Sequence, residues 1–132
     1  MEEIVDCIKN VEHILGNHYK ENIYQFALYT ELNLRGYMVQ TEVIVPVYYK
    51  SVYVGFERAD LVIYNKDATI MCILELKSQN ARLGNKEINQ LRKYLNNTST
   101  EYGILVNFYE SLEMVRVNKI SHQKISCDTS QI

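Results

Sequence analysis

Two neighbouring apolar runs constrain the fold of this chain more than any other feature of its sequence. Residues 58–64 and 69–77 are rich in β-branched, aromatic and aliphatic side chains, and residues 65–68 between them have the composition of a turn. The two runs therefore predict an antiparallel β-hairpin.

The predicted hairpin gathers three ionisable side chains at one end. A tight turn places Asp60 opposite Ile73, and because side chains alternate between the faces of a strand, Asp60, Glu75 and Lys77 then project from one face. Burying such groups without a partner is costly, and a divalent cation held by the two carboxylates is one physical answer. Two alternatives stay open here: Asp60 as a turn cap, and Glu75 with Lys77 as a solvated ion pair.

Length and composition predict one globular domain. The 132 residues are 47% hydrophobic and 23% charged, which is enough apolar material for a single core. The sequence has no run of about 18 apolar residues, and its first residues are acidic, so we expect neither a membrane span nor a secretory signal but an intracellular protein, cytoplasmic or nuclear. The three cysteines are widely spaced, which argues against a disulfide framework or a zinc site.

Charge is unevenly distributed along the chain. Residues 1–31 hold six acidic and two basic side chains, a net charge of −4, whereas residues 77–93 hold five basic and one acidic side chain, a net charge of +4. The positive segment begins at Lys77, so a phosphate-bearing ligand could lie beside the two acids; a solvated face is the other explanation. The candidates to hold such a substrate are Arg82, Lys86 and Lys93.

Apolar residues recur at helical spacing in three segments. The first helix is predicted to end near Gly16, the second to cover about residues 20–34, and the third about residues 86–96. The residues expected on the apolar side of the second helix are Ile23, Phe26, Ala27 and Leu34.

Further strand-like runs lie on both sides of the hairpin, at residues 38–46, 47–54, 103–108 and 113–120. The run at 103–108 follows a helical crossover, which implies parallel pairing with the second hairpin strand, and 113–120 would be an edge strand. This order predicts an α/β fold in which helices flank a small mixed sheet. We expect one domain over residues 1–120 and a flexible tail over residues 121–132.

A series of short motifs follows the same order along the chain. They are Leu15-Gly16, Glu21-Asn22-Ile23-Tyr24, Ala27-Leu28, Glu31-Leu32, Pro46-Val47-Tyr48-Tyr49-Lys50, Val54-Gly55, Arg58-Ala59-Asp60, Leu74-Glu75-Leu76-Lys77, Gln90-Leu91 with Tyr94-Leu95, and Gly103-Ile104-Leu105-Val106-Asn107-Phe108. Together they resemble the GxxExxY proteins of the PD-(D/E)XK nuclease superfamily over nearly the whole chain. One position departs from the pattern, because the signature glycine falls on His18.

The resemblance implies a restriction-endonuclease-like α/β sandwich with a metal-dependent catalytic site. Asp60 and Glu75 would bind Mg²⁺ or Mn²⁺, with the backbone carbonyl of Leu76 as a further ligand. Lys77 would act on the attacking water and on the scissile phosphate, unless it only pairs with Glu75. Glu21 matches the acid of the first core helix, which completes the water shell of the metal or binds a second ion.

The resemblance also assigns residues around the catalytic strand. Gln90 and Tyr94 match a Q-x-x-x-Y motif, and their one-turn spacing lets both face the site, although Tyr94 could equally belong to the core. Arg58 could contact phosphate or pair with Glu57 or Glu75. Most of the eleven tyrosines are interleaved with apolar residues and read as structural, whereas a base-stacking role stays open for Tyr48, Tyr49 and Tyr53.

The sequence thus predicts a metal-dependent endo- or exonuclease acting on DNA rather than RNA. The alternative is a nucleic-acid-binding or assembly module that keeps the fold without cutting. A sugar hydrolase using Asp60 and Glu75 is disfavoured because Lys77 stands beside them. A chain this small covers little of a duplex, so a homodimer would let it act on two strands.

Overall fold

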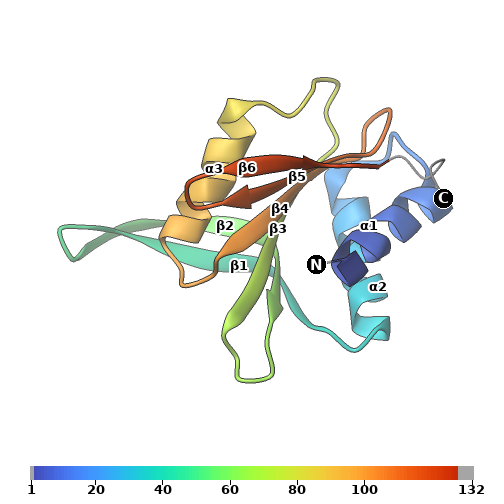
Figure 1. Cartoon of the computed structure of the whole chain (residues 1–132). Helices are drawn as coiled ribbons and strands as arrows, with labels where there is room; N and C mark the ends of the chain where they lie inside the picture. Colours follow the sequence, from blue (N-terminus) through green and yellow to red (C-terminus); the bar gives the residue numbers. More distant parts are fainter. Residues whose placement is uncertain (1, 128–132) are drawn as a thin grey trace.

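The computed structural model describes residues 2–127 as three helices and six strands (Figure 1). In chain order they are α1 (Glu2–Leu15), α2 (Glu21–Leu34), β1 (Met38–Tyr49), β2 (Val52–Tyr64), β3 (Ile70–Lys77), α3 (Asn85–Asn96), β4 (Tyr102–Asn107), β5 (Glu113–Asn118) and β6 (His122–Ile125). None of these helices is both long and apolar enough to cross a membrane.

The strands form one sheet in the order β1-β2-β3-β4-β5-β6. Every neighbouring pair is antiparallel except β3 and β4, which run parallel and are joined through α3. The predicted α/β fold and the predicted parallel pair are confirmed, since a parallel connection needs a crossover of this kind. Figure 1 shows α1 and α2 on one side of the sheet and α3 on the other.

Each face of the sheet has its own buried cluster. Beneath α1 and α2 the cluster includes Ile8, Leu28 and Leu74, and beneath α3 it includes Ile73 and Leu91. The alternation of Ile73 and Leu74 between the two clusters shows that β3 is buried on both faces, as its nearly continuous apolar sequence requires. The strand therefore offers a rigid support for the charged residues at its end.

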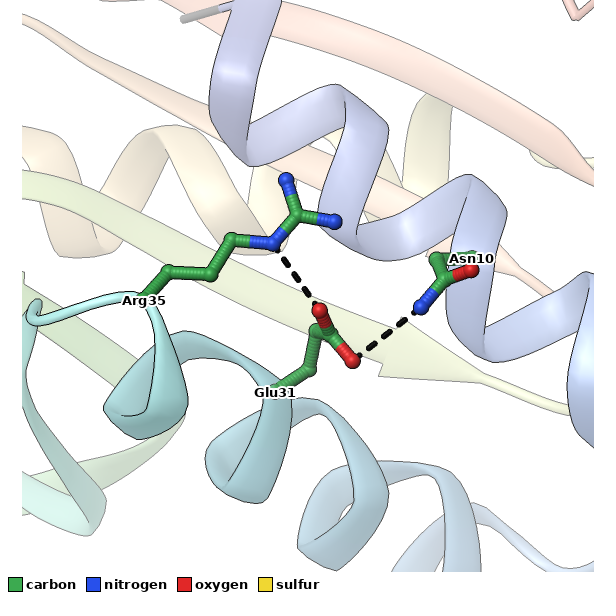
Figure 2. A network of polar contacts seen from close by, with 3 residues as sticks. All are labelled: Asn10, Glu31 and Arg35. Atoms are coloured by element: carbon green, nitrogen blue, oxygen red, sulfur yellow. Dashed lines mark hydrogen bonds and ion pairs between the residues drawn. The ribbon is translucent and has the colours of Figure 1, made fainter.

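The two helices on the first face are joined by a small polar network (Figure 2). The amide of Asn10 on α1 donates to Glu31 on α2 at 3.1 Å, and Arg35 Nε donates to the other carboxylate oxygen of Glu31 at 2.9 Å. Glu31 is thus held between two donors, which fixes α2 against α1 above the sheet.

The register of the β2–β3 hairpin differs from the prediction. Leu61 pairs with Leu74 and Ile63 with Cys72, after which an irregularity shifts the pairing of Tyr64. Continuing this register places Asp60 beside Glu75, so the predicted position opposite Ile73 is wrong. The predicted register is wrong by an even number of residues. An even shift leaves each side chain on the same face of the sheet, so Asp60 and Glu75 still lie together.

The strand boundaries before the predicted hairpin also differ from the prediction. The predicted runs 38–46 and 47–54 are parts of one long hairpin, in which β1 continues past Pro46 and turns back at Lys50 and Ser51, both at positive φ. Pro46 is tolerated because β1 is an edge strand, where a missing N–H breaks no ladder.

The predicted apolar side of α2 is largely wrong. Ile23, Phe26 and Leu34 are exposed, whereas Ala27 is half-buried against the core. The residues of α2 that are buried are Tyr24, Leu28 and Leu32. Apolar residues occur on more than one side of this helix, so spacing alone could not select the inward side.

The C-terminal segment is more ordered than predicted. His122–Ile125 form β6, which pairs with β5, so β5 is not the sheet edge. The strand is short and mostly exposed and polar, features that protect an edge but hide it in the sequence. The rest of the predicted tail, 128–132, lies outside the described residues.

Candidate active site

Asp60 on β2 and Glu75 on β3 are fixed side by side by backbone hydrogen bonds. The N–H of Asp60 donates to Glu75 Oε1 at 3.0 Å, and the N–H of Leu76 donates to Asp60 Oδ2 at 2.8 Å. In each carboxylate, one oxygen therefore accepts a hydrogen bond from the neighbouring strand, and the second oxygen could bind a ligand. The reciprocal arrangement pre-orients both groups without a side-chain partner.

The two carboxylates lie in a poorly solvated place. Glu75 is only 3% exposed, and burial, followed by the negative charge of Asp60, raises the pKa of Glu75 to about 8. Burial likewise raises the pKa of Asp60 to about 6, although the N–H of Leu76 favours the charged form. Ionising both groups together is unfavourable, and a nearby cation would relieve the repulsion.

The donor set fits a hard divalent cation. Two carboxylates with free oxygens, beside a strand backbone, are the kind of protein ligand that Mg²⁺ takes while keeping several of its waters. Within residues 2–127, no group of three or more His, Cys, Asp or Glu side chains is gathered to hold a metal ion. The protein would thus supply few ligands, and water or substrate the rest.

Lys77 stands beside the carboxylates without forming an ion pair with either. Across the described chain the single ion pair joins Arg35 and Glu31. Lys77 Nζ instead donates to Gln90 Oε1 at 3.4 Å, and its charge lowers the pKa of both carboxyl groups. The predicted alternative, a simple Glu75–Lys77 salt bridge, is therefore not observed in this part of the chain.

Helix α3 carries Gln90, which contacts Lys77, and Tyr94, which contacts Gln90. Gln90 accepts from Lys77 and donates through Nε2 to the Tyr94 hydroxyl at 3.3 Å. The ring of Tyr94 is 2% exposed and packs in the α3-side core, and burial together with the charge of Glu75 raises the pKa of Tyr94. Tyr94 is thus a neutral phenol that is both a core residue and the support of Gln90.

Glu21, the first residue of α2, lies near the end of β3 but not within a three-acid group. Its Oε1 accepts from the N–H of Ser78 at 3.4 Å, and its charge raises the pKa of Asp60 and of Glu75. The Ser78 hydroxyl donates to the Tyr19 carbonyl at 2.6 Å, which ties the start of α2 to the end of β3.

Tyr24 and Phe108, to which the sequence pattern gives no site role, position the start of α2. The Tyr24 hydroxyl donates to the Gly16 carbonyl at 2.6 Å, and the Tyr24 ring stacks on Phe108 with centroids 4.1 Å apart. The N–H of Phe108 in turn donates to the Lys77 carbonyl at 3.0 Å. A tyrosine three residues after Glu21 was the available signal, but only the fold shows what it contacts.

Asn107 is a second missed residue. It is 4% exposed, and its amide accepts from the N–H of Gln79 at 3.1 Å and donates to the carbonyls of Gln79 and Ala81 at 3.2 and 3.0 Å. These bonds fix the loop that carries Arg82. The signal in the sequence was a polar amide ending an otherwise apolar strand.

Glu42 is a third missed residue. It lies on β1 across from Asp60, at φ +52°, and accepts from Gln25 Nε2 at 3.3 Å. Its charge contributes to the raised pKa of Asp60. Nothing in the sequence separates Glu42 from an ordinary exposed strand residue, because its proximity depends on the β1–β2 register.

The predicted basic residues are exposed around this site. Arg82 lines a cavity of about 460 Å³ next to Asn107, while Lys86 and Lys93 lie on α3 one turn before and about one turn after Gln90. Arg58 forms no ion pair with Glu57 or Glu75 in the described structure, and its guanidinium lies 5.8 Å from the Phe56 ring centroid. Phosphate contact by these residues stays a prediction.

His18 has a backbone conformation that suits glycine. Its φ is +76°, and its ring makes an edge contact with Tyr109 at 4.9 Å between centroids. We expect His18→Gly to unfold with roughly 0.5–1 kcal/mol more free energy than His18→Ala, because both lose the ring but only glycine relieves the left-handed backbone. Urea unfolding of the two variants measures this difference, and equal stabilities would show that the backbone there is unstrained.

A mixed sheet between helices, with a half-buried and a buried carboxylate on adjacent strands and a lysine two residues beyond the second, defines a nuclease-type α/β fold. The chain belongs to the PD-(D/E)XK nuclease superfamily, whose family model matches residues 1–120. Phosphodiester hydrolysis of nucleic acid is the general reaction of this superfamily, its members generally use divalent metals, and some members are inactive.

Solved structures support the fold. The crystal structure of SSO0001 aligns with this chain at a TM-score of 0.56 and 24% sequence identity, over 74% of this chain and 50% of that one. This chain thus spans half the length of that protein, and the likeness concerns the fold alone. No curated protein matches the chain.

Proposed function

We propose that this chain is a metal-dependent nuclease of the GxxExxY type that hydrolyses phosphodiester bonds in DNA. The observation that carries the proposal is the adjacent pair of half-buried Asp60 and buried Glu75, both with raised pKa values and with Lys77 beside them but not paired to them. Such a pair is costly for a fold that only binds, and useful for one that must hold a cation.

The proposed metal ligands are Asp60, Glu75 and the carbonyl of Leu76, with Glu21 acting through water. A bound Mg²⁺ or Mn²⁺ would polarise the scissile phosphate and lower the pKa of an attacking water. Lys77, oriented by Gln90, would stabilise negative charge that develops on the phosphate oxygens.

The basic residues would hold the substrate backbone. Arg58, Arg82, Lys86 and Lys93 are exposed near the site, and phosphate contacts of this kind position a nucleic acid without reading its sequence. We propose a single catalytic domain over residues 1–120, and a homodimer as the form that would act on two strands.

One observation favours the non-catalytic binding module as a second candidate. Among residues 2–127 only two carboxylates converge, with Glu21 and Glu42 acting on them at longer range. An inactive member would keep the charged site as a relic or as a phosphate-binding surface.

A single-turnover cleavage assay separates the two candidates. We expect the wild-type chain to cut labelled DNA in Mn²⁺ or Mg²⁺, and Asp60→Asn to lose both cleavage and calorimetric metal binding, because one of two carboxylate ligands is gone. Asp6→Asn, an exposed change on α1, is the matched control. Single- and double-stranded DNA and RNA are assayed in parallel. If the wild type cuts none of them yet binds them as tightly as Asp60→Asn does, the binding module is correct.

A further inference from the structure

The distal half of the β1–β2 hairpin carries an exposed apolar surface that the proposed catalytic site does not use. Figure 1 shows this hairpin as a long two-stranded ribbon that extends away from α1 and α2. Between 47% and 64% of the surface of each of its large apolar side chains is exposed. These residues are Ile44, Tyr48, Tyr49, Val52, Tyr53, Val54 and Phe56. Exposed apolar surface gathered on one element marks an interaction site.

The register collects aromatic rings on one side of the ribbon. Tyr48 pairs with Tyr53, Pro46 with Phe56, and Ile44 with Arg58, and cross-strand partners share a face. The Tyr48 and Tyr53 rings are 6.1 Å apart, and Arg58 lies over the Phe56 ring. We call Tyr48, Tyr53, Phe56 and Arg58 the aromatic face.

The opposite side of the ribbon is occupied by the protein itself. Val45 and Ala59 are buried in the α3-side cluster, and Val43 packs against it. Glu57 pairs with Val45, so its charge belongs to that side, while the aromatic face carries the cation Arg58. At the turn, Lys50 Nζ lies 5.6 Å from the Tyr49 ring centroid, which adds a second cation beside aromatic surface.

We propose that the aromatic face stacks on unpaired bases of single-stranded nucleic acid and leads the strand to Asp60 and Glu75. Aromatic rings interleaved with cations are the surface that single strands bind, because each base offers a π face and each nucleotide a phosphate. This proposal rests on the proposed nuclease function and names its substrate as single-stranded.

A second copy of the chain fits this surface less well. Pairing through the free edge of β1 would have to pass Pro46, which has no N–H, and Glu42, whose left-handed backbone departs from extended geometry within the strand. Proline and local irregularity are the features that prevent edge-to-edge association. The cation on the aromatic face favours an anionic partner instead.

The aromatic face ends on β2 two residues before Asp60, on the side of the ribbon opposite the α3-side cluster, whereas Glu75 and Lys77 lie on the α3 side of the sheet. Arg58 and Asp60 lie two residues apart on β2, and Tyr53 is seven residues before Asp60 on the same strand. At about 3.3 Å per residue this is roughly 23 Å, or about seven stacked nucleotides at about 3.4 Å each. A strand of about twelve nucleotides is thus long enough to span both regions.

The test measures binding in EDTA, where cleavage cannot contribute. Fluorescence anisotropy compares a labelled twelve-residue thymidine strand with an abasic strand of the same length and with a blunt duplex. We expect the thymidine strand to bind the wild-type chain about tenfold or more tightly than the abasic strand. The triple variant Tyr48→Leu, Tyr53→Leu, Phe56→Leu keeps apolar surface but removes the rings, and it should bind both strands equally.

The matched control is Phe26→Leu, an exposed aromatic change on α2 outside the hairpin, which should retain the wild-type preference. Equal binding of both strands by the wild type, or an unchanged preference in the triple variant, overturns the proposal. So does a dimer in sedimentation that the triple variant abolishes, because the face then belongs to a second copy. Base-dependent binding without cleavage in Mn²⁺ would leave this proposal standing while the nuclease proposal fails, and cleavage without base dependence would do the reverse.

Discussion

Replacing Lys77 with methionine is expected to slow single-turnover cleavage by a factor on the order of 10² to 10³, the range for removing one preorganised electrostatic contact from a reacting centre. Methionine keeps the length and most of the apolar stem of lysine, so the chain should stay folded. Asp60 and Glu75 are untouched, so metal binding should remain. The ammonium group alone is removed, together with its bond to Gln90.

Three measurements on Lys77→Met separate a catalytic role of Lys77 from a structural one. Cleavage is timed in Mn²⁺, metal binding is titrated by calorimetry, and substrate affinity is measured in EDTA. Lys66→Met, a change in the exposed turn before β3, is the matched control and should behave as wild type. A rate of Lys77→Met within a factor of two of the wild-type rate would remove Lys77 from the mechanism. A loss of metal affinity equal to that of Asp60→Asn would mean that Lys77 acts on the folding of the site.

The sequence was sufficient to predict the fold class and the meeting of Asp60 with Glu75, because both depend on period and parity. The exact register was not predictable, because it includes an irregularity between Ile63 and Tyr64 that alternation of side chains does not encode. The predicted meeting of Asp60 with Glu75 is nevertheless correct, because the register error is an even number of residues. An odd error would have turned Asp60 to the opposite face of the sheet.

The prediction of which side of α2 is buried is wrong for a different reason. Tyr24 is fully buried because its hydroxyl donates to the Gly16 carbonyl and its ring stacks on Phe108, two partners that lie outside α2. Hydrophobicity alone ranks Phe26 above Tyr24, although Phe26 is exposed. A tyrosine can be buried when its hydroxyl has a hydrogen-bond partner, and the spacing of apolar residues does not reveal whether such a partner exists.

The residues that tune the site were also beyond the sequence. Glu42 acts on Asp60 only because β1 pairs with β2 at that point, and Asn107 fixes the loop after β3 only because β4 runs parallel to β3. Both are consequences of non-local pairing. The motif residues Gln90 and Tyr94 could be predicted because one helical turn already brings them together.

A second large effect is expected when Glu75 is replaced by glutamine in the metal-free protein. Both site carboxyl groups have folded-state pKa values, about 6 for Asp60 and about 8 for Glu75, that lie above the usual values near 4. The folded state therefore holds protons more tightly than the unfolded state, and the contribution of the pair to stability is greatest below about pH 4. It is lost as pH rises to about 8.

Glu75→Gln removes the group with the larger shift while keeping an oxygen that can accept from the N–H of Asp60. In EDTA the variant should melt at a higher temperature than the wild type at pH 8, and the difference should shrink toward pH 5. Millimolar Mn²⁺ at pH 8 should raise the melting temperature of the wild type and should do little for the variant. At a free Mn²⁺ concentration of 100 times Kd, the expected stabilisation of the wild type is about 2.7 kcal/mol. Glu101→Gln, an exposed change, is the control. If Glu75→Gln melts below the wild type at pH 8 without metal, the two carboxylates do not repel each other, and the electrostatic reason for a cation between them is lost.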